Sequence, residues 1–150
     1  MSLNSQTKRN RVPSQNSCNP LGEHMFEERV EFRSKLGEFV KYGRKFDKAV
    51  DTVLAGGVKE SRFRPSGRKI FSVVGRMGDE FIDPEKPYCS CSNFFFRVVS
   101  GREELCYHLL SYRIAAKTGR IDVIDFTDEE YPAYLAATVR DVLEVIGKSS

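Results

Sequence analysis

The sequence predicts an α+β fold: an N-terminal helix or helix pair, a small antiparallel β-meander, a compact Cys/His segment that leads into a helix, and a C-terminal helix. Three observations predict it. Apolar residues recur at helical spacing near both ends of the chain. β-Branched and aromatic runs separated by turn residues occupy the middle. Three of the four cysteines lie with one histidine inside residues 89–108.

The first part of the chain divides into a polar segment and a helical one. Residues 1–22 are rich in Ser, Asn, Gln and basic residues, so we expect a disordered tail. Residues 23–57 form the predicted N-terminal helical segment, where Gly43 can divide two helices and Gly56-Gly57 ends the second. The apolar residues at helical spacing are Phe32, Leu36, Phe39, Val40, Phe46, Val50, Val53 and Leu54.

Residues 58–120 are predicted to hold the β-meander and the Cys/His segment. "VKESRFR" and "RKIFSVV" flank the turn Pro65-Ser66-Gly67, and "EFIDP" is a short third strand. "NFFFRVV" is expected to be a fourth strand or an extended arm, with Phe94 and Phe96 in the core. "YHLLSYRIAAKT" is a helix closed by Gly119.

Residues 121–150 form the predicted C-terminal helical segment. After the extended piece "IDVIDF", Thr127 and Glu130 have capping-box spacing, and the helix is expected to start near Tyr131. Its apolar stripe comprises Tyr131, Leu135, Val139, Val142 and Ile146. Such a stripe must be buried. It can pack on the N-terminal helix, dock a partner protein, or meet a second copy of the chain.

The cysteines and the histidine occur in two pairs that each skip one position, Cys89-x-Cys91 and Cys106-x-His108. In an extended segment, residues i and i+2 point to the same face, so the first pair can aim both sulfurs at one point. The second pair can do so only if Cys106 precedes a helix and His108 lies in its first turn. The exposed N–H groups of that helix then favour a thiolate at Cys106.

Three thiolates and one imidazole form a closed tetrahedral site of the kind that holds structural zinc. We therefore predict one structural zinc ion per chain, contributing about 10–16 kcal/mol of folding free energy. Cys18, in the polar tail, and His24, at the start of the first helix, are not expected to be ligands. Because no nucleophile–base pair, phosphate loop or paired-acid motif stands out, we expect no enzyme.

Charge is unevenly distributed although the net charge is only +3. Residues 122–144 are acidic, whereas a basic strip near the hairpin comprises Arg62, Arg64, Arg68, Lys69 and Arg76. This strip is the candidate nucleic-acid-binding surface. The chain has no run of eighteen apolar residues and its first twenty lack an apolar signal region, so we expect no membrane contact and an intracellular location.

The spacing of the two ligand pairs, with fourteen residues between them, resembles the SWIM zinc finger. "SGRKIFSVVG" followed by "YCSCSNFFFRVVSGREELCYHLLS" is similar to the small SWIM-domain subunit of the Shu recombination complex, and suggests a prokaryotic or archaeal homologue. Two positions depart from that pattern. Tyr107 replaces a basic residue between the last two ligands, and Ser111 replaces an alanine.

The resemblance implies a non-catalytic accessory factor in homologous recombination and DNA repair. Such a protein acts with a RecA/Rad51-type recombinase paralog, near single-stranded DNA. The alternative is a stand-alone SWIM DNA-binding module in transcription or mobile-DNA function. The sequence leaves open whether the chain forms a homodimer and whether it acts in a prokaryotic cytoplasm or a eukaryotic nucleus.

Overall fold

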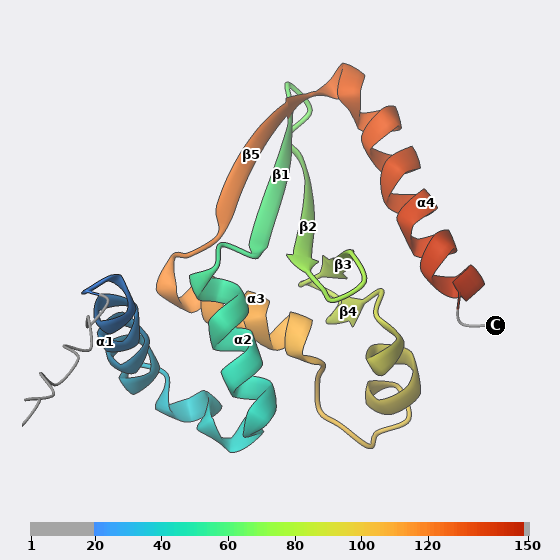
Figure 1. Cartoon of the computed structure of the whole chain (residues 1–150). Coiled ribbons are helices and arrows are strands. Elements are labelled where there is room, and N and C mark those ends of the chain that lie inside the picture. Colours follow the sequence, from blue (N-terminus) through green and yellow to red (C-terminus); the bar gives the residue numbers. More distant parts are fainter. Residues whose placement is uncertain (1–19, 149–150) are drawn as a thin grey trace, which may run out of the picture.

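Three helices open the part of the chain that the structure, a computed structural model, describes: residues 20–148, with side chains described for 22–144 (Figure 1). They are α1 (Pro20–Ser34), the 3-10 helix η1 (Gly37–Tyr42) and α2 (Arg44–Leu54). Gly43 separates the last two and has a positive φ of 58°, which favours glycine. Residues 1–19 of the predicted tail lie outside the described range, and residues 20–22 already belong to α1. None of the helices in residues 20–148 is long and apolar enough to cross a membrane.

A five-stranded sheet follows, in the order β4-β3-β2-β1-β5. β1 (Val58–Arg64), β2 (Arg68–Val74), β3 (Asp79–Asp83) and the two-residue β4 (Tyr88–Cys89) form an antiparallel meander. The predicted meander is therefore confirmed. Helix α3 (Tyr107–Thr118) also has the predicted bounds and ends at Gly119, which is left-handed with φ 68°.

The strand β5 (Asp122–Thr127) makes the sheet mixed, because it pairs in parallel with β1. The sequence predicted this piece to be extended but gave no pairing partner. β5 lies at the edge of the sheet, and its Val123 and Ile124 side chains are exposed. The predicted α+β class is confirmed. The sheet has one strand, β5, in addition to the meander β1–β4.

The hydrophobic core lies between α2, α3 and the end of the sheet where β1 begins. Val58 and Val73 are opposite each other in the β1–β2 register, and both are fully buried. Phe71 on the same face packs edge-to-face against Tyr112 of α3, with 5.3 Å between ring centroids. Other fully buried members of this core are Leu36, Phe46, Val50, Ile82, Leu110 and Ile114. Cys89 and Cys106 belong to the same cluster, so the Cys/His segment is part of the core.

The C-terminal helix α4 (Tyr131–Lys148) packs on the opposite face of the sheet. The capping box is present as predicted, and the short turn η3 (Asp128–Glu130) leads into α4 at Tyr131. Phe63 of β1 is fully buried among the rings of Phe126, Tyr131 and Tyr134. Of the possibilities named for the α4 stripe, packing on the N-terminal helix is wrong, since α1 and α4 lie at opposite sides of the molecule (Figure 1).

Part of the predicted stripe on α4 is open to solvent: Leu135 and Val139 are 37% and 54% exposed, whereas Tyr131 and Val142 are half-buried. Leu143, which is not in the predicted stripe, is 61% exposed. The side chain of Ile146, which completes the predicted stripe, lies outside the described residues. The sheet therefore covers one side of α4 and leaves an apolar row on the other.

The segment "NFFFRVV" is helical, so the expected strand or extended arm is wrong. Residues Phe94–Val98 form one π-helical turn, η2, between the two ligand pairs. A helical turn is short enough to let the chain return toward Cys106. Only Phe94 and Val98 pack against the core, while Phe96 is 74% exposed, contrary to the expected burial.

Candidate metal centre

The first ligand pair is held in extended form by the neighbouring strand. Cys89 ends β4, opposite Ile82 of β3. Ser90, between the two cysteines, donates its backbone N–H to the Phe81 carbonyl and its hydroxyl to Glu80, at 2.9 and 2.6 Å. Its hydroxyl oxygen also accepts the Phe81 N–H. With residue 90 fixed on β3, the Cys89 and Cys91 sulfurs both point into the core.

The second pair lies at the start of α3, as the spacing predicted. Cys106 is the N-cap residue, with extended backbone angles, and His108 is in the first turn. The preceding residue is anchored by Lys45 of α2, whose Nζ donates to the Leu105 carbonyl at 2.8 Å. The ring of Tyr107, the residue between the two ligands, contacts the His108 imidazole in a tilted arrangement, with 3.9 Å between the ring centroids.

The structure brings all four predicted ligands together. One ligand atom from each of Cys89, Cys91, Cys106 and His108 lies within 4.8 Å of the others, and all four residues are buried. Both ring nitrogens of His108 are buried without a hydrogen-bond partner. Such an orphaned polar group is costly unless something binds it. A Cys3His set with this geometry fits one structural zinc ion, whose bonds to sulfur and nitrogen are about 2.3 and 2.0 Å long.

The three thiols are electrostatically unequal. Hydrogen bonds from Cys89 and Cys91, together with the backbone N–H groups of Leu109 and His108, lower the pKa of Cys106. The hydrogen bonds that Cys89 makes to Cys106 and Cys91, and its burial, raise the pKa of Cys89. The thiolate thus forms first at the N-terminus of α3, as the sequence predicted. Cys91 also receives an N–H from Phe94, at 3.4 Å from its sulfur, which offsets the negative charge of a three-thiolate site.

Two residues that support this centre were not identified from the sequence. The first is Ser90, which in the sequence is only the residue between Cys89 and Cys91. A polar residue between two ligands that are expected to be buried is a signal that could have identified it. The second is Gly75, where a Cβ would lie 2.7 Å from the Gly78 carbonyl oxygen and 3.1 Å from His108 Nε2. The β2–β3 turn can therefore approach the histidine this closely only with glycine at position 75.

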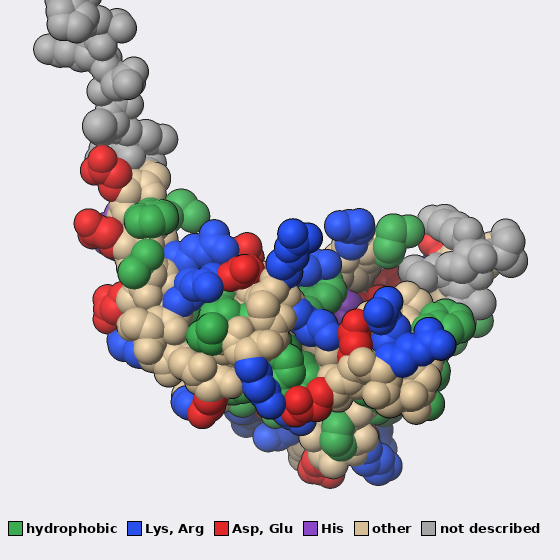
Figure 2. All heavy atoms as spheres, turned by 90° about the horizontal axis from the view of Figure 1, so that it is seen from below, with side chains coloured by type: hydrophobic (Ala, Val, Ile, Leu, Met, Phe, Trp, Pro, Cys, Tyr) green, Lys and Arg blue, Asp and Glu red, His purple; other side chains and the backbone are tan. Residues whose placement is uncertain are grey.

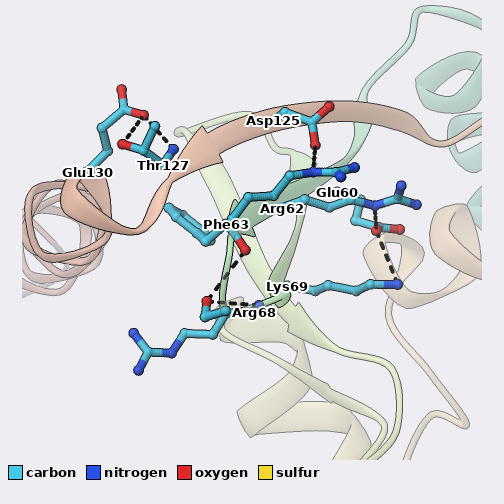
Figure 3. A network of polar contacts seen from close by, with 10 residues as sticks. Glu60, Arg62, Phe63, Arg68, Lys69, Asp125, Thr127 and Glu130 are labelled. Atoms are coloured by element: carbon cyan, nitrogen blue, oxygen red, sulfur yellow. Dashed lines mark hydrogen bonds and ion pairs between the residues drawn. The ribbon is translucent and has the colours of Figure 1, made fainter.

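The five basic residues of the predicted strip do not share one surface. Figure 3 labels three of them, Arg62, Arg68 and Lys69. Arg62 and Lys69 are opposite each other on β1 and β2, and Arg64 follows on the same face. Arg68 lies on the other face, where its guanidinium stacks on Tyr131 of α4, 4.7 Å from the ring centroid. Arg76 lies in the β2–β3 turn, beside the metal centre rather than the hairpin.

Acidic neighbours neutralise much of the charge on the hairpin. Glu60 is buried and makes ion pairs with Arg62 and Lys69, while Arg64 pairs with Asp125 of β5 at 3.1 Å. Burial opposes ionisation of Glu60, but its hydrogen bond from Arg62 and the charge of Lys69 outweigh this and lower its pKa. Arg62, Arg64 and Lys69 also line a pocket of ≈ 510 Å³ beside the turn.

Comparison with known proteins supports the SWIM resemblance. The chain is 33% identical over 75 residues to a protein described as "Zinc finger SWIM domain-containing protein 7 homolog" from Dictyostelium discoideum. The aligned part covers 49% of this chain and 48% of that relative, so the chain spans about half the length of the curated relative it matches. No protein-family model and no solved structure matches the chain significantly.

The similarity and the buried cluster point to the same conclusion. A SWIM-domain relative and a Cys3His group at SWIM spacing confirm the predicted resemblance to SWIM zinc-finger proteins. They also fit the prediction of one structural zinc ion per chain. His24 is exposed on α1, and Cys18 lies outside the described residues.

Proposed function

We propose that this chain is a non-catalytic, zinc-dependent accessory factor in homologous recombination and DNA repair. It acts with a recombinase-paralog protein and lies close to single-stranded DNA. The observation that carries the proposal is the buried Cys3His cluster in a chain similar to a SWIM-domain protein. The flanking "SGRKIFSVVG" and "CYHLLS" segments are the features that favour a Shu-type factor among SWIM proteins.

The ligand set supports a structural rather than a catalytic metal. A catalytic zinc ion keeps one coordination position for water or substrate. Here four protein ligands are available, and none of the four is more than 5% exposed. The centre joins β4 to α3, so it holds the sheet and the helix of the core together.

The exposed row on α4, formed by Leu135, Val139 and Leu143, supports a protein partner. These residues are spaced four apart and so lie on one side of the helix. Asp141 and Glu144 are exposed on the same helix, and Asp128, Glu129 and Glu130 precede it. Acidic side chains repel phosphate, so this end of the molecule is better suited to a protein than to DNA.

The experiment that tests the proposal is affinity purification of the tagged chain from its native source, with the co-purifying proteins identified. A recombinase paralog is the expected partner. Recovery of RNA polymerase or a transposase would contradict the proposal and select the alternative, a stand-alone DNA-binding module in transcription or mobile-DNA function.

We expect the double substitution Val139→Asp with Leu143→Asp to abolish partner binding while leaving the fold and the zinc intact. Both side chains are more than half exposed, so an aspartate there stays hydrated, but it must be desolvated when a partner covers it. Co-purification yield and sedimentation velocity are the measurements. The matched control is Val30→Asp with Val40→Asp, two similarly exposed valines on α1 and η1, which should retain the partner.

If the α4 variant unfolds, or binds its partner as the control does, the docking assignment is wrong. If the unsubstituted chain sediments as a dimer and the α4 variant as a monomer, the row instead binds a second copy of the chain.

We also expect the hairpin to contribute to binding of single-stranded DNA. Replacing Arg64 and Lys69 together by glutamine should make the fall of log affinity with log salt shallower. The magnitude of the slope should decrease by about 1.4, at about 0.7 per lost phosphate contact. The converse variant, Glu60→Gln, removes the acid that pairs with Arg62 and Lys69 and should strengthen binding. Fluorescence anisotropy with a labelled oligothymidine measures both effects. Unchanged slopes in both variants would exclude the hairpin as a contact.

A further inference from the structure

Two cations without acidic partners lie beside the metal centre. Lys48 of α2 and Arg76 of the β2–β3 turn are exposed, and among the described residues neither has a carboxylate within salt-bridge distance. Burial of its ammonium group lowers the pKa of Lys48, and the positive charge of Arg76 lowers it further. Both cations adjoin the ligand segment, because Lys48 contacts Tyr107 and Arg76 follows Gly75, where a Cβ would lie 3.1 Å from His108 Nε2. By contrast, Arg62, Arg64 and Lys69 of the hairpin each pair with an acid. Such a pair is suited to an anion.

An aromatic ring joins these cations to the ligand segment. The Lys48 ammonium lies over the Tyr107 ring, 3.8 Å from its centroid, and the Tyr107 ring contacts His108.

A second aromatic group borders the same centre. On η2, Phe95 and Phe96 are 50% and 74% exposed, and the Phe95 ring packs against Tyr88 and Phe94. The Phe94 N–H is bound by Cys91, so the metal centre fixes this turn. Arg102, just beyond η2, is exposed and has no carboxylate within salt-bridge distance among the described residues.

Both groups border the Cys3His cluster. Tyr107 lies between the ligands Cys106 and His108 in the chain, and Phe94, whose ring contacts Tyr88 and Phe95, donates its N–H to the Cys91 sulfur. Viewed from below, the molecule shows Lys and Arg side chains interspersed with apolar and some acidic ones (Figure 2).

We propose that this face, with Lys48, Arg76 and Tyr107 on one side of the metal centre and Phe95 and Phe96 on the other, binds single-stranded nucleic acid. The cations contact phosphates and the exposed rings stack on bases. Alternating cations and rings match a strand that alternates phosphates and bases. This inference rests on the proposed function and adds a second contact surface to the hairpin.

The test uses the full chain and a fluorescein-labelled oligothymidine of about 20 nucleotides, with anisotropy measured over a range of salt concentrations. Lys48→Gln with Arg76→Gln should decrease the magnitude of the slope of log affinity against log salt by about 1.4, so that affinity falls less steeply with salt. The control is Lys117→Gln with Arg120→Gln, which removes the same charge near the far end of α3, where both residues pair with acids. The control should keep the slope of the unsubstituted chain.

Ring stacking is tested separately at Phe96. Phe96→Leu should weaken binding by at least about fivefold with no change in the salt slope, because it removes a stacking ring and no charge. Phe96→Tyr should restore the affinity. Zinc content is measured for every variant, so that a folding defect is recognised.

The inference is overturned if the Lys48/Arg76 variant behaves as the Lys117/Arg120 control, or if the unsubstituted chain binds no oligothymidine. Binding to phosphatidylserine vesicles in place of the oligothymidine would also overturn it and identify a membrane-facing surface. None of these results bears on the recombinase-paralog partner, which co-purification tests independently.

Discussion

Cys91→Ser is expected to lose zinc and to unfold the middle of the chain. A structural zinc ion contributes about 10–16 kcal/mol, as much as or more than the about 5–15 kcal/mol by which a whole domain is usually stable. A serine hydroxyl does not replace a thiolate ligand, and the other three ligand residues are buried members of the core. Removing the metal therefore also destabilises the packing of α3 on the sheet.

Metal analysis and circular dichroism of the purified variant check this result. Cys18→Ser is the matched control, because the same substitution at a cysteine outside the ligand set should change neither zinc content nor spectrum. The account is contradicted if the unsubstituted chain keeps its native spectrum in a chelator that has removed all metal.

Phe63→Ala is expected to have the second-largest effect, a loss of about 3–5 kcal/mol in the free energy of unfolding. The Phe63 ring is fully buried and lies 4.9–5.3 Å from the ring centroids of Phe126, Tyr131 and Tyr134. It is thus the main apolar contact between β1, β5 and α4. Urea unfolding measures the loss, and hydrogen exchange should show α4 less protected than α3.

The matched control for this prediction is Phe96→Ala, the same substitution at a ring that is 74% exposed. Surface substitutions usually change stability by no more than about 0.5 kcal/mol. If the two variants are equally stable, the assignment of α4 to the sheet through Phe63 is wrong.

The features that the sequence predicted well are those with local causes. The two ligand pairs converge because extended residues i and i+2 share a face and because Cys106 caps a helix. Gly119 and the Thr127–Glu130 capping box likewise mark the ends of helices where they were predicted, because each depends only on residues a few positions away.

The features that the sequence did not predict depend on distant partners. Nothing within "DVIDFT" indicates that it pairs in parallel with β1, more than fifty residues earlier. "NFFFRVV" has strand composition, but its two ends are tied to Cys91 and Cys106, and a helical turn meets that constraint. The basic strip looks continuous in the sequence, yet alternation along β2 places Arg68 and Lys69 on opposite faces.

The most direct test of the central claim, a closed Cys3His zinc centre, is X-ray absorption at the zinc edge on the natively purified protein. The account predicts one zinc ion per chain with three sulfur neighbours at about 2.3 Å and one imidazole nitrogen at about 2.0–2.1 Å. A coordination shell with fewer than three sulfurs or with a bound water, or a folded protein without zinc, would contradict it.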